Sequence, residues 1–185
     1  MSRIVTVSDV QEYFYTAVQK AIQKTRVEIS QESQAYLVQL LCMFSRCEHA
    51  YAGVEYKQQP AIALLLQRAQ EADAPEAMRT FKHVGDCCLY TAGLFEESLT
   101  RRGLTRTYYV GMGESAYYHL SALLSQKMSS TAGLYEQLSQ EFSRLVHALH
   151  ALAEQTNNIQ NKNRKGLLPR NTLDGGSRCR PFHFA

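Results

Sequence analysis

Hydrophobic residues recur every three or four positions along most of the first 152 residues, the spacing that gathers them on one face of an α-helix. Alternation with a period of two, which is typical of a half-buried strand, is nearly absent. The pattern predicts six helices, at residues 8–24, 30–51, 60–70, 75–102, 105–123 and 130–152. Ser30 and Thr105 occupy expected N-cap positions. Because the connections are short, we expect an all-α protein folded as a single six-helix bundle.

The helix predicted at 75–102 carries a sustained apolar seam, with further apolar residues beside it. Between residues 84 and 95 its only formally charged side chain is Asp86. A helix that is apolar on most sides is buried on most sides, so we expect this one to lie at the centre of the bundle. Gly85 and Gly93 each cost about 1 kcal/mol in a helix interior, and we expect the close approach of neighbouring helices to offset that cost.

Charge and periodicity both divide the chain near residue 155. Residues 1–155 contain 14 basic and 16 acidic residues, a net charge of −2, whereas residues 156–185 contain six basic residues and one acidic residue, a net charge of +5. We therefore expect a bundle domain over 1–155 and an irregular basic tail over 156–185. A mildly acidic body lacks the clustered basic face of a nucleic-acid-binding protein, so we expect any contact with nucleic acid to be weak and confined to the tail.

The composition is that of a globular protein, with 45% hydrophobic and 20% charged residues. The longest aliphatic run, at residues 61–66, is far shorter than the roughly 20 residues of a membrane-spanning helix. The start of the chain has no apolar core of the kind found in signal peptides. We therefore expect a cytoplasmic protein that does not enter a membrane and whose cysteines are free thiols.

The motifs of several enzyme classes are missing from the sequence. The chain has no Glu-x-x-His pair of the kind that di-iron helical bundles use, and no Cys-x-x-Cys pair for zinc. It has no phosphate-binding Walker loop and no Gly-x-Ser-x-Gly nucleophile turn. These observations favour a protein that is not an enzyme and that carries no cofactor.

A weak candidate for a metal site lies on the last predicted helix. His147, His150 and Glu154 stand at positions i, i+3 and i+7, a spacing that brings their side chains near one another. Leu145 and Leu149 already form the inward face of this helix. A polar, solvent-facing stripe is therefore the more ordinary interpretation of the three residues.

A second constellation lies on the central predicted helix, where His83, Asp86 and Tyr90 share one side. A carboxylate among apolar neighbours must be paired or hydrogen-bonded if it is buried, because an unpaired buried charge costs several kcal/mol. In a functional interpretation Asp86 orients His83 as an acid, a base or a ligand, and these residues line an internal pocket together with His119. In a structural interpretation Asp86 accepts a hydrogen bond from a tyrosine or an arginine of a neighbouring helix.

Tyrosine is abundant, with 11 residues against 7 phenylalanines. The helix predicted at 105–123 carries two adjacent pairs, Tyr108 with Tyr109 and Tyr117 with Tyr118, and such pairs expose one ring while burying the other. Exposed tyrosines are frequent in protein interfaces. We therefore take Tyr108 and Tyr118 as candidate interface residues.

Two segments of the sequence have a recognisable pattern. The first, VGDCCLYTAGLFEESLTRRG at 84–103, contains Gly-Asp-x-x-Leu-Tyr-x-x-Gly-x-Phe, and the second, TYYVGMGESAYYHL at 107–120, contains Tyr-Tyr-x-x-Met-Gly-x-x-Ala-Tyr. Over about residues 8–152 the chain resembles a bacterial family of all-helical proteins with no known activity. The resemblance implies a helical fold and a bacterial source, and it implies no function.

Taken together, the residues favour a non-enzymatic helical bundle that acts by binding or protein–protein interaction. We expect self-association as a homodimer, and an unidentified protein is a further possible partner. The alternative is a bundle that binds a small molecule, haem or metal in a polar pocket at His83, Asp86 and Tyr90.

Overall fold

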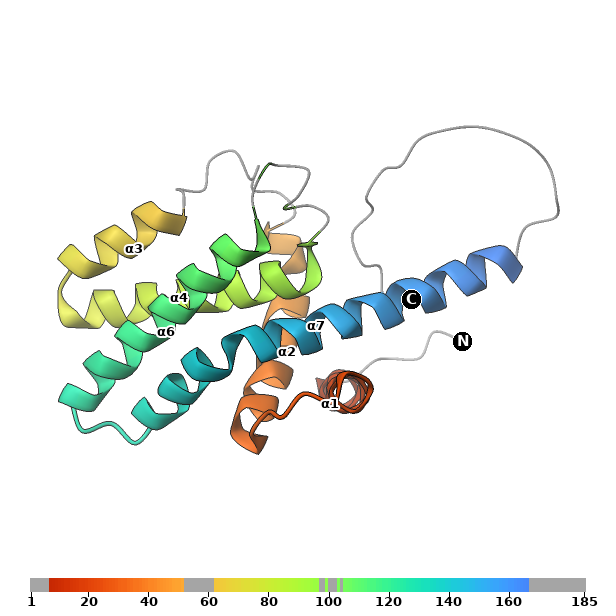
Figure 1. Ribbon diagram of the computed structural model, residues 1–185, viewed down its shortest axis with the longest axis horizontal. Coiled ribbons are helices and arrows are strands. Elements are labelled where there is room, and N and C mark those ends of the chain that lie inside the picture. Colours follow the sequence, from red (N-terminus) through yellow and green to blue (C-terminus); the bar gives the residue numbers. More distant parts are fainter. Residues whose placement is uncertain (1–6, 52–61, 97–98, 100–102, 104, 167–185) are drawn as a thin grey trace.

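The computed structural model describes residues 7–51, 62–96, 99, 103 and 105–166 (Figure 1). Within these residues the chain forms helices and no strand, which confirms the all-α prediction. The helices correspond one to one to those predicted: α1 (Val7–Thr25), α2 (Gln31–Tyr51), α3 (Ile62–Glu71), α4 (Ala74–Leu94), α6 (Arg106–Gln126) and α7 (Ala132–Gly166). None of these described helices combines the length and the hydropathy needed to cross a lipid bilayer.

Two helix starts follow the predicted N-caps. The Thr105 hydroxyl accepts the backbone N–H of Tyr108 at 3.2 Å, and the Ser30 hydroxyl accepts that of Ser33 at 3.1 Å. The backbone N–H of Ser30 also lies 3.4 Å from both carboxylate oxygens of Glu141, a buried residue of α7. A carboxylate is favourable beside the positive end of a helix dipole, so this contact fixes the start of α2 against α7.

Three helices form the middle of the bundle, because α4, α6 and α7 each pack against the other two. Helix α3 runs back along α4, while α1 and α2 pack against each other and against α7 (Figure 1). In this view α1 is seen end-on and α7 runs across the picture, so the two cross rather than lie parallel. The chain thus forms a bundle in which the first two helices are turned relative to the rest.

The predicted central helix is buried, as expected. Phe81, Val84, Cys88, Leu89 and Ala92 of α4 are each at most 3% exposed. Helix α7 shares the central position, because it packs against α1, α2, α4 and α6 and its own inward side chains are equally buried.

Glycines allow the three middle helices to approach closely. A β-carbon at these glycines would overlap the facing side chain in each of three pairs: Gly85 with Tyr117, Gly93 with Leu149, and Gly113 with Phe142. This confirms the packing role expected for the two glycines of α4, and Gly113 of α6 makes a contact of the same kind.

Helix α4 ends earlier than the predicted boundary at residue 102. Its last residue is Leu94, and Phe95 leaves the helical conformation at φ −125° and ψ 33°. Gly93, a weak helix former, lies just before this point. Leu99 is nevertheless 3% exposed, so the apolar pattern beyond the helix end still contributes to the core. Most of the remaining predicted helix lies outside the described residues.

Helix α7 is longer than predicted. We expected an irregular tail from residue 156, but α7 continues to Gly166 and its end extends past α1 (Figure 1), so the prediction is wrong for residues 156–166. The sequence between Leu152 and Gly166 contains no proline or glycine, and extending an existing helix is much easier than starting one. The helical spacing of hydrophobic residues therefore ends at Leu152, where packing against the bundle ends, but the helix itself continues. The rest of the predicted tail, 167–185, lies outside the described residues.

Candidate functional site

Asp86 is a buried carboxylate in the middle of α4, with 3% of its surface exposed. Its Oδ1 atom accepts hydrogen bonds from the hydroxyls of Tyr36 at 2.6 Å and of Tyr117 at 2.7 Å. Its Oδ2 atom forms an ion pair with Lys82 Nζ at 2.6 Å. Both oxygens are therefore engaged, as a buried carboxylate requires.

This network joins several helices, because Tyr36 lies on α2, Asp86 on α4 and Tyr117 on α6. The two tyrosine rings meet edge to face at 6.1 Å, and each also lies within 5.9 Å of the ring of Tyr135 on α7. Gly85 provides the space for the Tyr117 ring. The aromatic contacts add to the hydrogen bonds. Both depend on orientation, so they fix how the side chains in this part of the core are placed, in addition to the stability that apolar burial provides.

The surroundings of Tyr36 and Tyr117 keep both hydroxyls protonated, so both can donate hydrogen bonds to Asp86. Burial is the largest cause that raises the pKa of Tyr36 and of Tyr117, and the negative charge of Asp86 raises both further. The phenols therefore stay protonated over the ordinary pH range. Lys82 closes the network on its outer side, with Nζ 5.5 Å from the centre of the Tyr36 ring and its side chain 43% exposed.

The other candidate pocket residues lie elsewhere. His83 is exposed and its ring nitrogens lie 3.6 and 3.8 Å from the sulfur of Cys87. Tyr90 stacks on Phe44 at 4.1 Å between ring centres. His119 stacks on Phe81 in the same way at 5.2 Å. In the described contacts, two tyrosines and a lysine bind Asp86. A tyrosine donor agrees with the structural interpretation of Asp86. The positive charge beside it comes from Lys82 and not from an arginine.

The partners of Asp86 were not identified from the sequence. Lys82 was detectable, because it stands four positions before Asp86 on the same helix and such pairs are common. Tyr36 and Tyr117 lie 50 and 31 positions away along the chain, and no local spacing connects them to Asp86.

Cys87 and His83 do not form an activated nucleophile. Burial is the main cause that raises the pKa of Cys87 to about 12, and Asp86 raises it further against an opposing effect of Lys82. A thiol with this pKa is almost entirely protonated near neutral pH, whereas nucleophilic cysteines have lowered pKa values. Cys88, on the next position, is fully buried and its pKa is also raised by burial.

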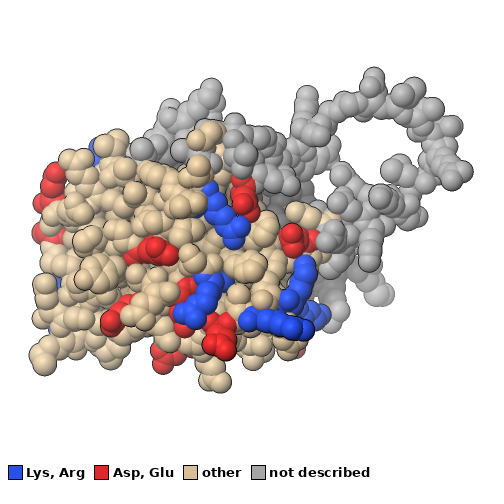
Figure 2. All heavy atoms as spheres, in the orientation of Figure 1, with Lys and Arg blue, Asp and Glu red and all other residues tan. Residues whose placement is uncertain are grey.

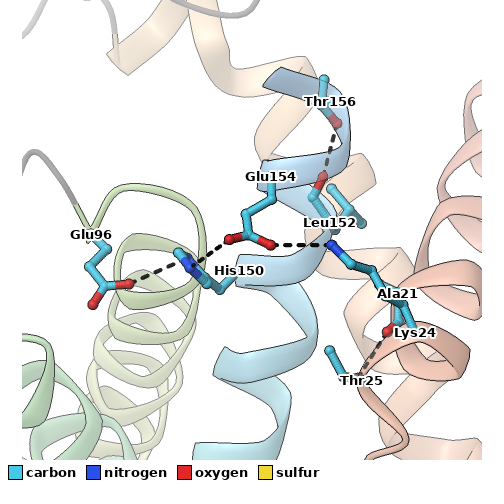
Figure 3. Close-up of polar contacts among 8 residues, drawn as sticks. All are labelled: Ala21, Lys24, Thr25, Glu96, His150, Leu152, Glu154 and Thr156. Atoms are coloured by element: carbon cyan, nitrogen blue, oxygen red, sulfur yellow. Dashed lines mark hydrogen bonds and ion pairs between the residues drawn. The ribbon is translucent and has the colours of Figure 1, made fainter. Parts of the chain in front are cut away.

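The structure brings two of the three residues of the weak metal candidate together, His150 and Glu154. His147 is exposed, whereas His150 lies between two carboxylates, Glu96 at 3.3 Å and Glu154 at 3.7 Å (Figure 3). Among the described residues, no group of three or more histidine, cysteine, aspartate or glutamate side chains is arranged to hold a metal ion.

The two candidate interface tyrosines differ in exposure. Tyr118 is 61% exposed, and Tyr108 is half-buried with its ring edge to face against Tyr109 at 5.7 Å. On the face of the molecule seen in Figure 2, lysine and arginine side chains are interspersed with aspartate and glutamate and form no broad basic area. Comparison of the chain with protein families, with curated proteins and with solved structures finds no match.

Proposed function

We propose that this protein is a non-enzymatic helical bundle that acts by binding, and that it associates with a second copy of itself through the outer face of α6. The observation that carries the proposal is an exposed tyrosine, Tyr118, on a helix whose fully exposed side chains are all uncharged. The engaged oxygens of Asp86 and the protonated thiol of Cys87 give little support to the alternative of a ligand pocket on α4. A cytoplasmic location, proposed from the sequence, is compatible with this role.

The outer α6 face consists of five exposed residues and the half-buried Ser115: Thr107, Gly111, Ser115, Tyr118, Ala122 and Ser125. The half-buried Glu114 borders this face and accepts a hydrogen bond from Ser143 of α7 at 3.3 Å. All six residues of the face itself are uncharged, and four of them are glycine, alanine or serine. A surface helix ordinarily carries charged residues on its solvent side. An uncharged face with one large aromatic side chain among small residues has the composition of an interface rather than of a solvated surface.

Gly111 is the second sign of a partner. A β-carbon at Gly111 would meet no other atom within 4 Å, in contrast to the tightly packed Gly85 and Gly113. Glycine in a helix interior costs about 1 kcal/mol relative to alanine, and packing within the described chain does not explain that cost here. Close approach of a helix from outside would explain it.

A second copy suits this face better than a charged partner. In a two-fold dimer the same face of each copy forms the contact. Because the six residues of this face are uncharged, such a contact brings none of their side chains into like-charge repulsion. In such an arrangement Tyr118 of one protomer packs against the small residues of its partner, among them Gly111 and Ala122. Tyr108 borders the same face and extends the contact.

Replacing Tyr118 with glutamate is expected to separate the dimer. The wild-type chain should have a mass of about 42 kDa by light scattering at high concentration, twice its 21.0 kDa. Burying an unpaired carboxylate costs several kcal/mol and each 1.4 kcal/mol is tenfold, so the dissociation constant of Tyr118→Glu should rise at least about 100-fold. The variant should therefore remain at the monomer mass.

The matched control is Tyr15→Glu, because Tyr15 is 56% exposed on α1, away from this face. It makes the same chemical change and should leave the dimer intact. A wild-type chain that stays at 21.0 kDa at every concentration contradicts the proposal. Equal dissociation of both variants contradicts the assignment to α6.

A further inference from the structure

The last part of α7 continues beyond the bundle, and we call its residues 156–166 the arm. Among the described side chains of α7, the last buried one is Ala153, and those from Glu154 to Asn157 are half-buried or exposed. The helix nevertheless continues to Gly166, and in Figure 1 this end of α7 extends past α1. The arm therefore begins where the packing of α7 against the bundle ends.

The arm carries positive charge and no negative charge. Its charged residues are Lys162, Arg164 and Lys165. Glu154, the last acidic residue before the arm, forms an ion pair with Lys24 of α1 at 3.3 Å (Figure 3). This ion pair offsets the negative charge that stands closest in sequence to the arm. The arm is thus a local concentration of cations attached to a mildly acidic body.

The other residues of the arm indicate which polyanion it suits. Five of its eleven residues are asparagine or glutamine. Lysine, arginine and amide side chains are among the usual donors to the phosphate and sugar oxygens of nucleic acids. A helix that lies on an anionic membrane needs an apolar face beside its basic one, and the arm has a single large apolar residue, Ile159. The composition therefore favours nucleic acid over a lipid surface.

The cations of the arm also repel one another. Lys162 and Lys165 stand three positions apart in a helix, a spacing at which like charges are destabilising. The arm contains no carboxylate that could offset this repulsion, and its asparagines are weak helix formers. A bound polyanion removes the repulsion, so binding also stabilises this end of the helix.

We propose that the arm binds the phosphate backbone of nucleic acid without reading its sequence. Its three cations displace counterions from the phosphates, so the affinity depends strongly on salt. Residues 1–155 have a net charge of −2, which disfavours a wider contact with the same phosphates. The proposal does not depend on the proposed dimer, whose contact lies on α6.

Fluorescence anisotropy of a labelled, mixed-sequence DNA duplex tests the proposal with the full chain. Each phosphate contact adds about −0.9 to the slope of log K against log salt concentration, so the three cations together should contribute about −2.7. The wild-type affinity should therefore fall at least about 40-fold between 50 and 200 mM salt. In the triple variant Lys162→Gln, Arg164→Gln and Lys165→Gln, the slope should flatten by about 2.7 and the affinity at 50 mM salt should fall at least about 10-fold.

The matched control removes three exposed cations elsewhere: Arg68→Gln on α3, Arg79→Gln on α4 and Lys127→Gln after α6. It lowers the net charge of the chain by the same amount as the arm variant, so it reproduces any effect of net charge alone. It should keep the wild-type slope. Circular dichroism checks that both triple variants remain folded.

Three results would overturn the proposal. One is a wild-type chain that does not bind the duplex at 50 mM salt. Another is an equal loss of affinity in the two triple variants, which would assign binding to net charge and not to the arm. The third is competition: poly-glutamate or phosphatidylserine vesicles that displace the labelled duplex as effectively as unlabelled DNA would identify an acidic protein or a membrane as the partner.

Discussion

Replacing Asp86 with alanine is expected to lower the free energy of unfolding by about 4 kcal/mol, because two buried hydroxyls lose their acceptor and Lys82 loses its ion pair. The hydroxyls belong to Tyr36 and Tyr117, which are 8% and 0% exposed and have no route to bulk water without moving the core. For a chain of 185 residues this corresponds to a fall of about 10 °C in Tm. Chemical denaturation followed by circular dichroism measures the free energy, and a thermal scan measures the Tm.

Two further variants define what this loss means. Asp86→Asn keeps an oxygen that accepts from the tyrosines but turns an amide donor toward Lys82, so about half of the loss is expected, a fall of several degrees. Glu136→Ala removes an exposed carboxylate from α7 and should change the stability by less than about 0.5 kcal/mol. If Asp86→Ala is as mild as Glu136→Ala, Asp86 is not a buried acceptor in solution.

Gly85→Ala is expected to cost about 3 kcal/mol, the second largest effect, through overpacking. The added methyl group would overlap the ring of Tyr117, which is fully buried and cannot swing aside without breaking its hydrogen bond to Asp86. In an exposed helix the same substitution stabilises, since alanine is the better helix former. A fall in the free energy of unfolding therefore indicates that Gly85 and Tyr117 are in close contact, and a rise indicates that they are not.

Gly133→Ala is the matched control for this experiment. Gly133 is exposed in the first turn of α7, and a β-carbon there meets no atom within 4 Å. Its replacement should be neutral or stabilising by up to about 1 kcal/mol. A stabilising Gly85→Ala would mean that α4 and α6 do not approach as closely as described.

Helical periodicity was sufficient to predict the fold class and the order of the helices. It works because each helix buries one face, and the burial of Leu138, Leu145 and Leu149 on α7 follows that rule. The N-caps at Ser30 and Thr105 were predictable for a similar reason, since the capping contact is local in sequence. The isolated charge of Asp86 in an apolar helix also indicated that this carboxylate has a buried partner.

Features that depend on the whole fold were not predictable from one sequence. The tyrosines that bind Asp86 come from α2 and α6, and which of the 11 tyrosines would meet it depends on how those helices cross. The ends of α4 and α7 were misplaced because an apolar pattern marks packing, whereas helix ends depend on backbone propensity. The position of His150 between Glu96 and Glu154 likewise requires residues from separate elements.

The central claim, that Asp86 and its two tyrosines form a closed core network, is tested most directly by following tyrosine ring carbons by NMR during a titration to alkaline pH. A free tyrosine ionises near pH 10. Because burial and Asp86 raise the pKa of Tyr36 and of Tyr117, their signals should remain unchanged through this range until the protein unfolds, and stability should fall as the pH rises above about 10. Ionisation of either residue near pH 10 in the folded protein would contradict the account.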